Sequence, residues 1–109
     1  MLPTVEPQAI GLARMDKTEK QIIAAVRGGR WVASSHADDR LAERRIETWQ
    51  VVEGFDDGET ILVDPDAVPN PKILRRQRLP DGIEVVVVWS YDHAARVAKL
   101  VTVYFEEAL

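Results

Sequence analysis

The chain has 109 residues, of which 46% are apolar and 29% are charged, a composition typical of one soluble globular domain. It contains no cysteine, which excludes disulfide bonds and thiolate metal sites and fits a reducing compartment. The formal net charge of −4 repels phosphate on average, which argues against nonspecific coating of nucleic acid.

The first residues are weakly apolar and are interrupted by Pro3 and Pro7. We therefore expect a flexible N-terminal arm over residues 1–14 and a single domain over residues 15–109. The arm lacks the basic region and the apolar run of a signal peptide. An apolar run such as Val85–Trp89 is far shorter than the ~20 residues that cross a bilayer. We expect a cytoplasmic protein that does not bind a membrane.

The first predicted helix begins at Asp16, which is a favourable N-cap residue, with Glu19 placed as its capping-box partner. Ile22 and Val26 recur at helical spacing, which predicts a buried stripe. The pair Gly28-Gly29 ends this helix.

Two further helices are predicted after a short extended segment at residues 31–33. Ser35 is expected to cap the first of them. The other helix covers Glu47–Glu53, and Ile46 and Val51 are spaced to pack together around its first turn as a hydrophobic staple.

From about residue 60 the apolar residues follow a period of two, which is typical of strands. Segments rich in proline and glycine separate these strands, and the connections are short. We therefore expect an α+β fold in which N-terminal helices pack on a four-stranded antiparallel meander. The predicted strands are 60–63, 72–79, 83–90 and 96–105.

The third predicted strand is apolar on both faces. Val85, Val87 and Trp89 lie on one face, and Val86 and Val88 lie on the other. A strand that is covered on one face only usually alternates with polar residues. The second face of the sheet is therefore expected to be covered.

The last predicted strand is mixed in the same way. Strict alternation places Val97, Val101 and Val103 on one side and Leu100 and Tyr104 on the other. We expect the N-terminal arm, a partner protein or a second copy of the chain to cover the apolar second face.

The second predicted helix carries the residues that most suggest chemistry. His36, Arg40, Glu43 and Arg44 lie at positions i, i+4, i+7 and i+8, so they share one helix face. Imidazole moves protons near neutral pH, and guanidinium binds phosphate or carboxylate through a planar fork. A structural interpretation is also open, because cations near a helix end complement its dipole and pair with nearby acids.

His36, Asp39 and Glu43 also have a spacing that could offer metal ligands from one helix. The adjacent arginines would repel a cation, and the chain has no His-Glu-x-x-His motif. We expect no metal and no other cofactor.

Charges are segregated further along the chain. An acidic stretch without a base is followed by a predicted strand that carries Lys72, Arg75, Arg76 and Arg78. Solvated surface is the usual meaning of such runs, but a basic strand near a basic helix could bind an anion on an acidic protein. The acidic residues are Glu53, Asp56, Asp57, Glu59, Asp64 and Asp66.

An ordered pattern runs through most of the chain and consists of His36-Ala37, Arg40, Arg44 and Ile46, then Gly54 after the next helix, then Thr102-Val103-Tyr104. This combination, over about residues 32–106, resembles the bacterial DUF4258 family. The resemblance implies a fold related to that of the RelE and BrnT toxins, with helices packed on a four-stranded antiparallel sheet.

The resemblance also implies a metal-independent endoribonuclease of toxin type that is held by an antitoxin or another partner. Such cleavage needs a base, an acid and cations that stabilise the charged phosphorane. His36 would be the base or acid, and Arg40 and Arg44 would clamp the phosphate. Tyr104 would donate a proton or orient the phosphate. The predicted RNA contacts on the sheet are Arg75, Arg76 and Arg78.

A noncatalytic protein-binding module of the same fold is the alternative. It would hold a partner, or form a homodimer, through the apolar second face of the sheet. The net charge favours this alternative, whereas the combination of His36, Arg40, Arg44 and Tyr104 favours the ribonuclease.

Overall fold

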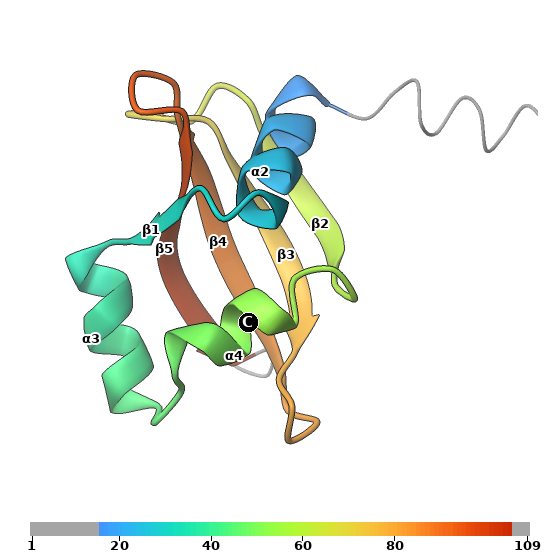
Figure 1. Cartoon of the computed structure of the whole chain (residues 1–109), viewed down its shortest axis with the longest axis vertical. Coiled ribbons are helices and arrows are strands. Elements are labelled where there is room, and N and C mark those ends of the chain that lie inside the picture. The colour runs from blue at the N-terminus through green and yellow to red at the C-terminus, as the bar shows by residue number, and fades with distance from the viewer. Residues whose placement is uncertain (1–15, 106–109) are drawn as a thin grey trace, which may run out of the picture.

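The helices and the sheet form two layers, with α2 and α4 across one face of the sheet and α3 beside β5, toward the edge that β1 forms (Figure 1). The computed structural model describes residues 16–105, so the predicted arm over residues 1–14 lies outside the described residues. The α+β class that the sequence predicts is confirmed. The elements are α2 (Lys17–Arg27), β1 (Trp31–Ala33), α3 (Ser35–Glu43), α4 (Thr48–Glu53), β2 (Glu59–Asp64), β3 (Lys72–Arg78), β4 (Glu84–Asp92) and β5 (Val97–Phe105).

The sheet has five strands in the order β1-β5-β4-β3-β2. Strands β2 to β5 form the predicted antiparallel meander. Strand β1 joins them in parallel with β5, with Trp31 opposite Ala98 and Ala33 opposite Leu100. The prediction of a four-stranded antiparallel sheet is therefore wrong. Three residues are too few to show a strand period, and their pairing partner lies far along the chain.

Helix α2 begins at the predicted N-cap residue Asp16, and the predicted capping box with Glu19 does not form. The Asp16 carboxylate accepts a hydrogen bond from the backbone N–H of Thr18 at 2.6 Å. Ile22 and Val26 are buried against the sheet and belong to the core. The helix ends in a glycine pair whose second member, Gly29, has a φ of +76°, a conformation that favours glycine. This turn returns the chain to the sheet edge, where β1 begins.

Helix α4 is fixed at its start by a capping box that was not predicted and by the two predicted staple residues. The backbone N–H of Glu47 donates to Oε1 of Gln50 at 2.8 Å. Ile46 and Val51, the predicted staple residues, are both buried in the core. The burial of Ile46 and Val51 therefore anchors the first turn of α4 to the core, while the hydrogen bond from Glu47 to Gln50 fixes where the helix begins.

The loop after α4 lies directly against the backbone of β3. A Cβ atom at Gly54 would collide with the carbonyl oxygen of Arg78, and one at Gly58 would lie 2.6 Å from the carbonyl oxygen of Arg76. Only a residue without a side chain allows this approach. The two glycines therefore place the loop over residues 54–58 beside β3.

The core between the helices and the sheet includes one buried polar connection. The Trp89 ring meets Phe55 edge to face, with centroids 5.5 Å apart. Its Nε1 donates to Oε1 of Gln77 at 3.0 Å, and Nε2 of Gln77 donates to the carbonyl oxygen of Val51 at 2.7 Å. Gln77 on β3 thus links β4 to α4, because its amide oxygen accepts one hydrogen bond and its amide nitrogen donates another.

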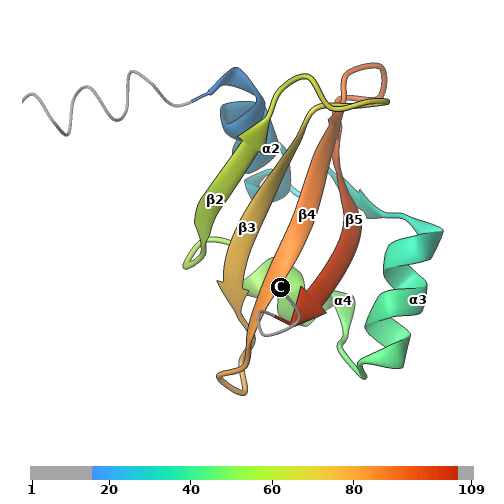
Figure 2. The same cartoon turned by 180° about the vertical axis from the view of Figure 1, so that it is seen from behind.

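The predicted division of β4 into two apolar faces is confirmed. Val85, Val87 and Trp89 belong to the core cluster beneath the helices. Val86 and Val88 alternate with them on the second face, which carries no helix in the described part of the chain (Figure 2). The centre of the second face is therefore apolar, and Val86 and Val88 are buried there although α2, α3 and α4 lie on the other side of the sheet.

Strand β5 departs from the predicted alternation because it contains a bulge at Val101, where the register of β4 and β5 shifts by one residue. Leu100 is fully buried in the core, whereas Tyr104 lies opposite Val86 on the second face. The expectation that Leu100 and Tyr104 share a face is wrong. So is the same expectation for Val101 and Val103, because Val103 belongs to the core.

Candidate functional site

Helix α3 starts where β1 leaves the sheet, and its first turn is tied to β5. The hydroxyl of Ser34 accepts from the backbone N–H of Ala37 at 3.0 Å and donates to the carbonyl oxygen of Val101 at 3.1 Å. The N-cap is therefore Ser34 and not the predicted Ser35. Ser34 also extends the β1 ladder through its N–H to Leu100, so its extended backbone directs the side chain at the helix.

His36 lies in the first turn of α3 and is exposed. Among the described residues its imidazole has no hydrogen-bond partner, so both ring nitrogens are accessible. Arg40 lies one turn further along the same helix and is partly exposed. The helix therefore presents an imidazole and a guanidinium on one accessible face, as their spacing predicts.

The two arginines of α3 share one carboxylate. Nη1 of Arg40 lies 2.8 Å from Oε1 of Glu43, and Nη1 of Arg44 lies 3.8 Å from the same oxygen. The guanidinium of Arg44 also lies over the Phe105 ring, 5.4 Å from its centroid, and its Nε is buried without a hydrogen-bond partner in the described structure. Glu43 partly neutralises the charge that would hold a phosphate.

Tyr104 lies away from the α3 residues. Its neighbours Val103 and Phe105 contact the core, and Tyr104 projects from the opposite face of the strand, across from Val86. Arg44 lies over Phe105, so the sheet separates the tyrosine from this arginine. Of the four predicted catalytic residues, His36, Arg40 and Arg44 thus lie on one helix or at its end, and Tyr104 lies apart from them.

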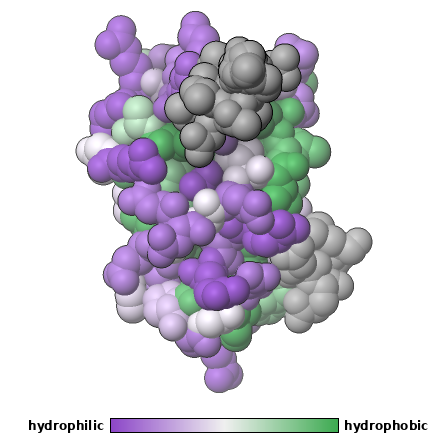
Figure 3. Space-filling view, turned by 90° about the vertical axis from the view of Figure 1, so that its right-hand side faces the viewer, coloured by the Kyte–Doolittle hydropathy of each residue, from purple (hydrophilic) through white to green (hydrophobic). Residues whose placement is uncertain are grey.

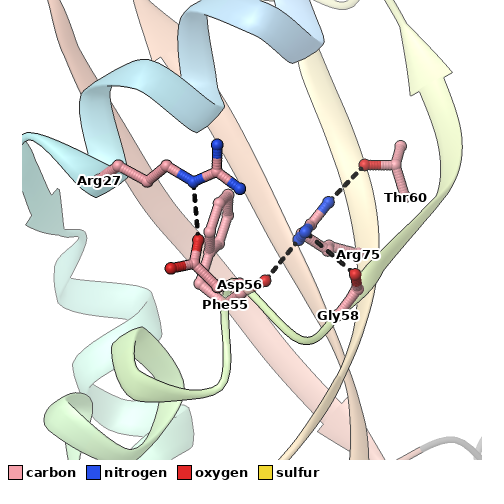
Figure 4. Close-up of polar contacts among 6 residues, drawn as sticks. All are labelled: Arg27, Phe55, Asp56, Gly58, Thr60 and Arg75. Carbon is pink, nitrogen blue, oxygen red and sulfur yellow. Dashed lines mark hydrogen bonds and ion pairs between the residues drawn. The ribbon is translucent and has the colours of Figure 1, made fainter. Parts of the chain in front are cut away.

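Arg75 lies in the interior, between β3 and the loop after α4 (Figure 4). Its Nε donates to the carbonyl oxygen of Phe55, one terminal nitrogen donates to Oγ1 of Thr60 and the other donates to the carbonyl oxygen of Gly58, each at 3.0 Å. The residue is 6% exposed. It holds the loop against β3 and offers no accessible surface to RNA.

The electrostatic environment of Arg75 is unusual because its three acceptors are neutral oxygens. Burial lowers the pKa of the guanidinium from its ordinary value by removing water from the charged form, while Glu19 raises it, Arg27 lowers it and Asp56 raises it. Asp56 itself is paired with Arg27 at 2.8 Å (Figure 4). A guanidinium keeps its proton in proteins, so Arg75 is a buried cation with a structural role.

The sequence carried a signal for this role. Arg75 alternates with Ile73 and Gln77, both of which are buried. Once Ile73 is assigned to the core, the period of two places Arg75 on the same face. Residue type alone groups Arg75 with Arg76 and Arg78, which are more exposed.

Arg76 and Arg78 lie on the second face, at the end of β3, beside a cavity of about 590 Å³. Nη1 of Arg76 lies 3.0 Å from Oε1 of Glu59, and Nη2 of Arg78 lies 2.9 Å from Oε2 of Glu84. This cavity contains more acids than bases, which disfavours a phosphate ligand. Its acidic residues are Glu53, Asp57, Glu59 and Glu84.

Within residues 16–105, no three histidine, aspartate or glutamate side chains are grouped closely enough to hold a metal ion. None of the helices in this range has the length and apolar composition needed to cross a membrane.

Apolar side chains remain exposed around the second face. Leu62 on β2 is 48% exposed, and Val68 in the loop between β2 and β3 is 91% exposed. Viewed from the β2 edge, hydrophilic residues dominate the middle of the molecule and hydrophobic residues gather along its right-hand margin (Figure 3). Leu62 and Val68 are therefore exposed at the rim of this face, whereas Val86 and Val88 at its centre are 0% and 8% exposed.

The sequence was compared with known protein families. The model of the family described as "Domain of unknown function (DUF4258)" matches residues 33–105, which include α3, α4 and β2 to β5. The chain belongs to the DUF4258 family. This DUF4258 domain begins at the last residue of β1 and includes His36, Arg40 and both sheet faces. Comparisons with curated proteins and with solved structures gave no match.

Proposed function

We propose that this DUF4258 protein is a noncatalytic cytoplasmic binding module that holds a protein partner, or a second copy of itself, on its second sheet face. One observation carries the proposal: Leu62 is 48% exposed and Val68 is 91% exposed, and both lie around a sheet face that the described helices do not cover. Exposed apolar surface of this kind is a feature of interaction sites. Burying the half of the Leu62 side chain that is still exposed would contribute about 1 kcal/mol.

The charges around the predicted RNA contacts support the same proposal. Arg40 and Arg44 share Glu43, Arg78 pairs with Glu84, and Arg75 is committed to the core. RNA phosphate would have to displace these interactions on a chain with a net charge of −4. A protein partner that covers apolar surface would displace none of them.

The proposal is tested by selecting peptides from a random displayed library on the immobilised full chain. Each selected peptide is then measured on wild type, on Leu62→Asp and on the matched control Ile83→Asp, whose residue is 47% exposed in the β3–β4 turn. We expect Leu62→Asp to weaken binding about tenfold or more. Ile83→Asp should leave it unchanged.

Self-association is measured in parallel by sedimentation velocity of the same three proteins. A homodimer that dissociates in Leu62→Asp and persists in Ile83→Asp would support the second copy as the occupant. A monomer whose selected peptides bind all three proteins equally would contradict the proposal.

A metal-independent endoribonuclease of toxin type, with a RelE-like fold and an antitoxin partner, is the second candidate. It is favoured by the accessible pair of His36 and Arg40 on α3. In this function His36 would remove or supply a proton while Arg40 contacts the phosphate. Arg44 would add positive charge from the end of the same helix, and Tyr104 would have to act from the second face.

The ribonuclease is tested by incubating the protein with RNA, free and ribosome-bound, in the presence of a chelator. His36→Ala and Arg40→Ala are compared with His93→Ala, which removes an exposed histidine from the turn before β5. Cleavage by wild type and His93→Ala that is lost in the other two variants would support catalysis by α3. Equal cleavage by all four proteins, or none by wild type, would remove this candidate.

A further inference from the structure

The second face contains a small cavity of about 240 Å³. Its apolar part is formed by Val88 and Val101 on the two central strands and by Val68 and Pro69 in the loop between β2 and β3. Val101 faces this side because Leu100 before it enters the core, and the bulge in β5 places Thr102 opposite Val88 while Val103 returns to the core. The cavity is therefore a built feature of the sheet and of the loop above it.

Polar groups form a row across the same cavity. Ser90 on β4 pairs with Lys72 on β3 and with Lys99 on β5, so the three residues lie side by side on adjacent strands. Directly opposed positions of a sheet share a face, and their Cβ atoms lie about 4.5–5.5 Å apart. The side chains of Lys72 and Lys99 thus start on either side of Ser90, which is 6% exposed, at the cavity wall.

Neither lysine has a carboxylate partner in residues 16–105. Asp64 lies opposite Lys72 on β2, but its carboxylate accepts from the backbone N–H of Asp66 and forms no ion pair with the lysine. Both lysines are partly exposed, so the stems can lie along the apolar wall while the ammonium groups stay available. This distinguishes the cavity from the larger one, whose arginines are paired with acids.

We propose that this cavity binds an acidic and apolar peptide segment of the partner protein. A carboxylate side chain of the segment is held between Lys72 and Lys99 and accepts a hydrogen bond from the Ser90 hydroxyl. A neighbouring apolar side chain packs against Val88 and Val101. The inference rests on the binding function proposed above and adds the chemistry of the partner.

The apolar lining favours a peptide over a nucleic acid. A phosphodiester strand would satisfy the two lysines but would leave Val88 and Val101 against ribose and phosphate. A peptide with alternating glutamate and leucine satisfies both parts of the cavity, because charged and apolar groups then lie close together. The negative charge of the whole chain opposes either ligand at long range, so recognition depends on these local contacts.

The test uses the full chain and a fluorescent peptide of alternating glutamate and leucine, measured by anisotropy. Two matched peptides carry glutamine or lysine in place of glutamate, and a single-stranded oligouridine serves as the nucleic-acid probe. We expect Lys72→Glu and Lys99→Glu each to weaken binding of the glutamate peptide about tenfold. Lys20→Glu, on the exposed side of α2, should have no effect.

A charge exchange makes the test independent of folding. The double variant Lys72→Glu/Lys99→Glu should lose the glutamate peptide and bind the lysine peptide instead. If the glutamate and glutamine peptides bind equally, and binding is lost in Leu62→Asp but not in the lysine variants, this inference is overturned and the binding function stands. Binding that none of these variants changes would overturn the inference and the binding function together. Preferential binding of oligouridine at these lysines would overturn the peptide as the ligand and favour RNA.

Discussion

The guanidinium of Arg75 lies over the Phe55 ring, 4.4 Å from its centroid, while its Nε donates to the carbonyl oxygen of the same residue at 3.0 Å. One side chain thus contacts both the ring and the backbone of Phe55. Because that ring packs on Trp89, Arg75 connects the loop after α4 to the centre of the core. Although Arg75 belongs to a basic run in the sequence, its role is therefore to stabilise the fold.

We expect Arg75→Met to lower the free energy of unfolding by about 2–4 kcal/mol, because the carbonyl oxygen of Gly58 loses its donor and that of Phe55 keeps only the N–H of Gly58. Arg75→Lys should recover little, since an ammonium cannot reproduce the planar fork. The measurement is urea unfolding followed by circular dichroism. Arg78→Met, at an exposed ion pair, is the control and should cost less than about 1 kcal/mol; equal losses for the two residues would contradict the assigned role.

The cap of α3 gives a second prediction. Ser34→Ala should destabilise the fold by about 0.5–2 kcal/mol, because the N–H of Ala37 and the carbonyl oxygen of Val101 each lose a partner. Ser35→Ala, one residue along, should change stability by less than about 0.5 kcal/mol. Thermal unfolding of the two variants decides between the two serines, and the reverse order would restore Ser35 as the cap.

Gln77 is the third case. Gln77→Leu removes the acceptor for the Trp89 indole N–H and the donor for the carbonyl oxygen of Val51. We expect a loss of about 2–4 kcal/mol in the free energy of unfolding, together with a change in tryptophan fluorescence. Gln21→Leu on α2 is the control; a Gln77→Leu variant as stable as this control would show that the buried connection is dispensable.

The core-facing position of Leu100 beside the bulge in β5 is tested by two substitutions, one on each face of the sheet. Leu100→Asp places a carboxylate in the core and should abolish cooperative folding, because a buried unpaired charge costs several kcal/mol. Leu62→Asp, on the second face, should remain folded. Circular dichroism and thermal melts compare the two, and a folded Leu100→Asp variant would mean that Leu100 faces outward.

Most of the fold can be read from local patterns. The α2 cap at Asp16, the staple of Ile46 and Val51, and strands β2 to β5 follow from spacing over a few residues, and the structure contains them. The parallel pairing of β1 and the bulge at Val101 do not follow, because each depends on a partner strand that the local sequence does not reveal.

In the candidate site, too, the residues placed by local spacing could be predicted, and those placed by strand pairing could not. Helical spacing predicts that His36 and Arg40 share an exposed face, since both belong to one helix. The position of Tyr104 depends on a one-residue shift of register, and that of Arg75 depends on which face of β3 enters the core. Residue type alone could not separate Arg75 from its neighbours, because burial and not charge distinguishes them.

The parallel pairing of β1 with β5 has a consequence for synthesis on the ribosome. The strand that β1 needs is β5, which comes last among the strands of residues 16–105, so β1 cannot be paired until β2, β3, β4 and β5 have been synthesised. Strand β5 also lies inside the sheet, and a nascent chain that ends before it exposes one side of β4. Shortened translation products that end before β5 are therefore candidates for chaperone capture.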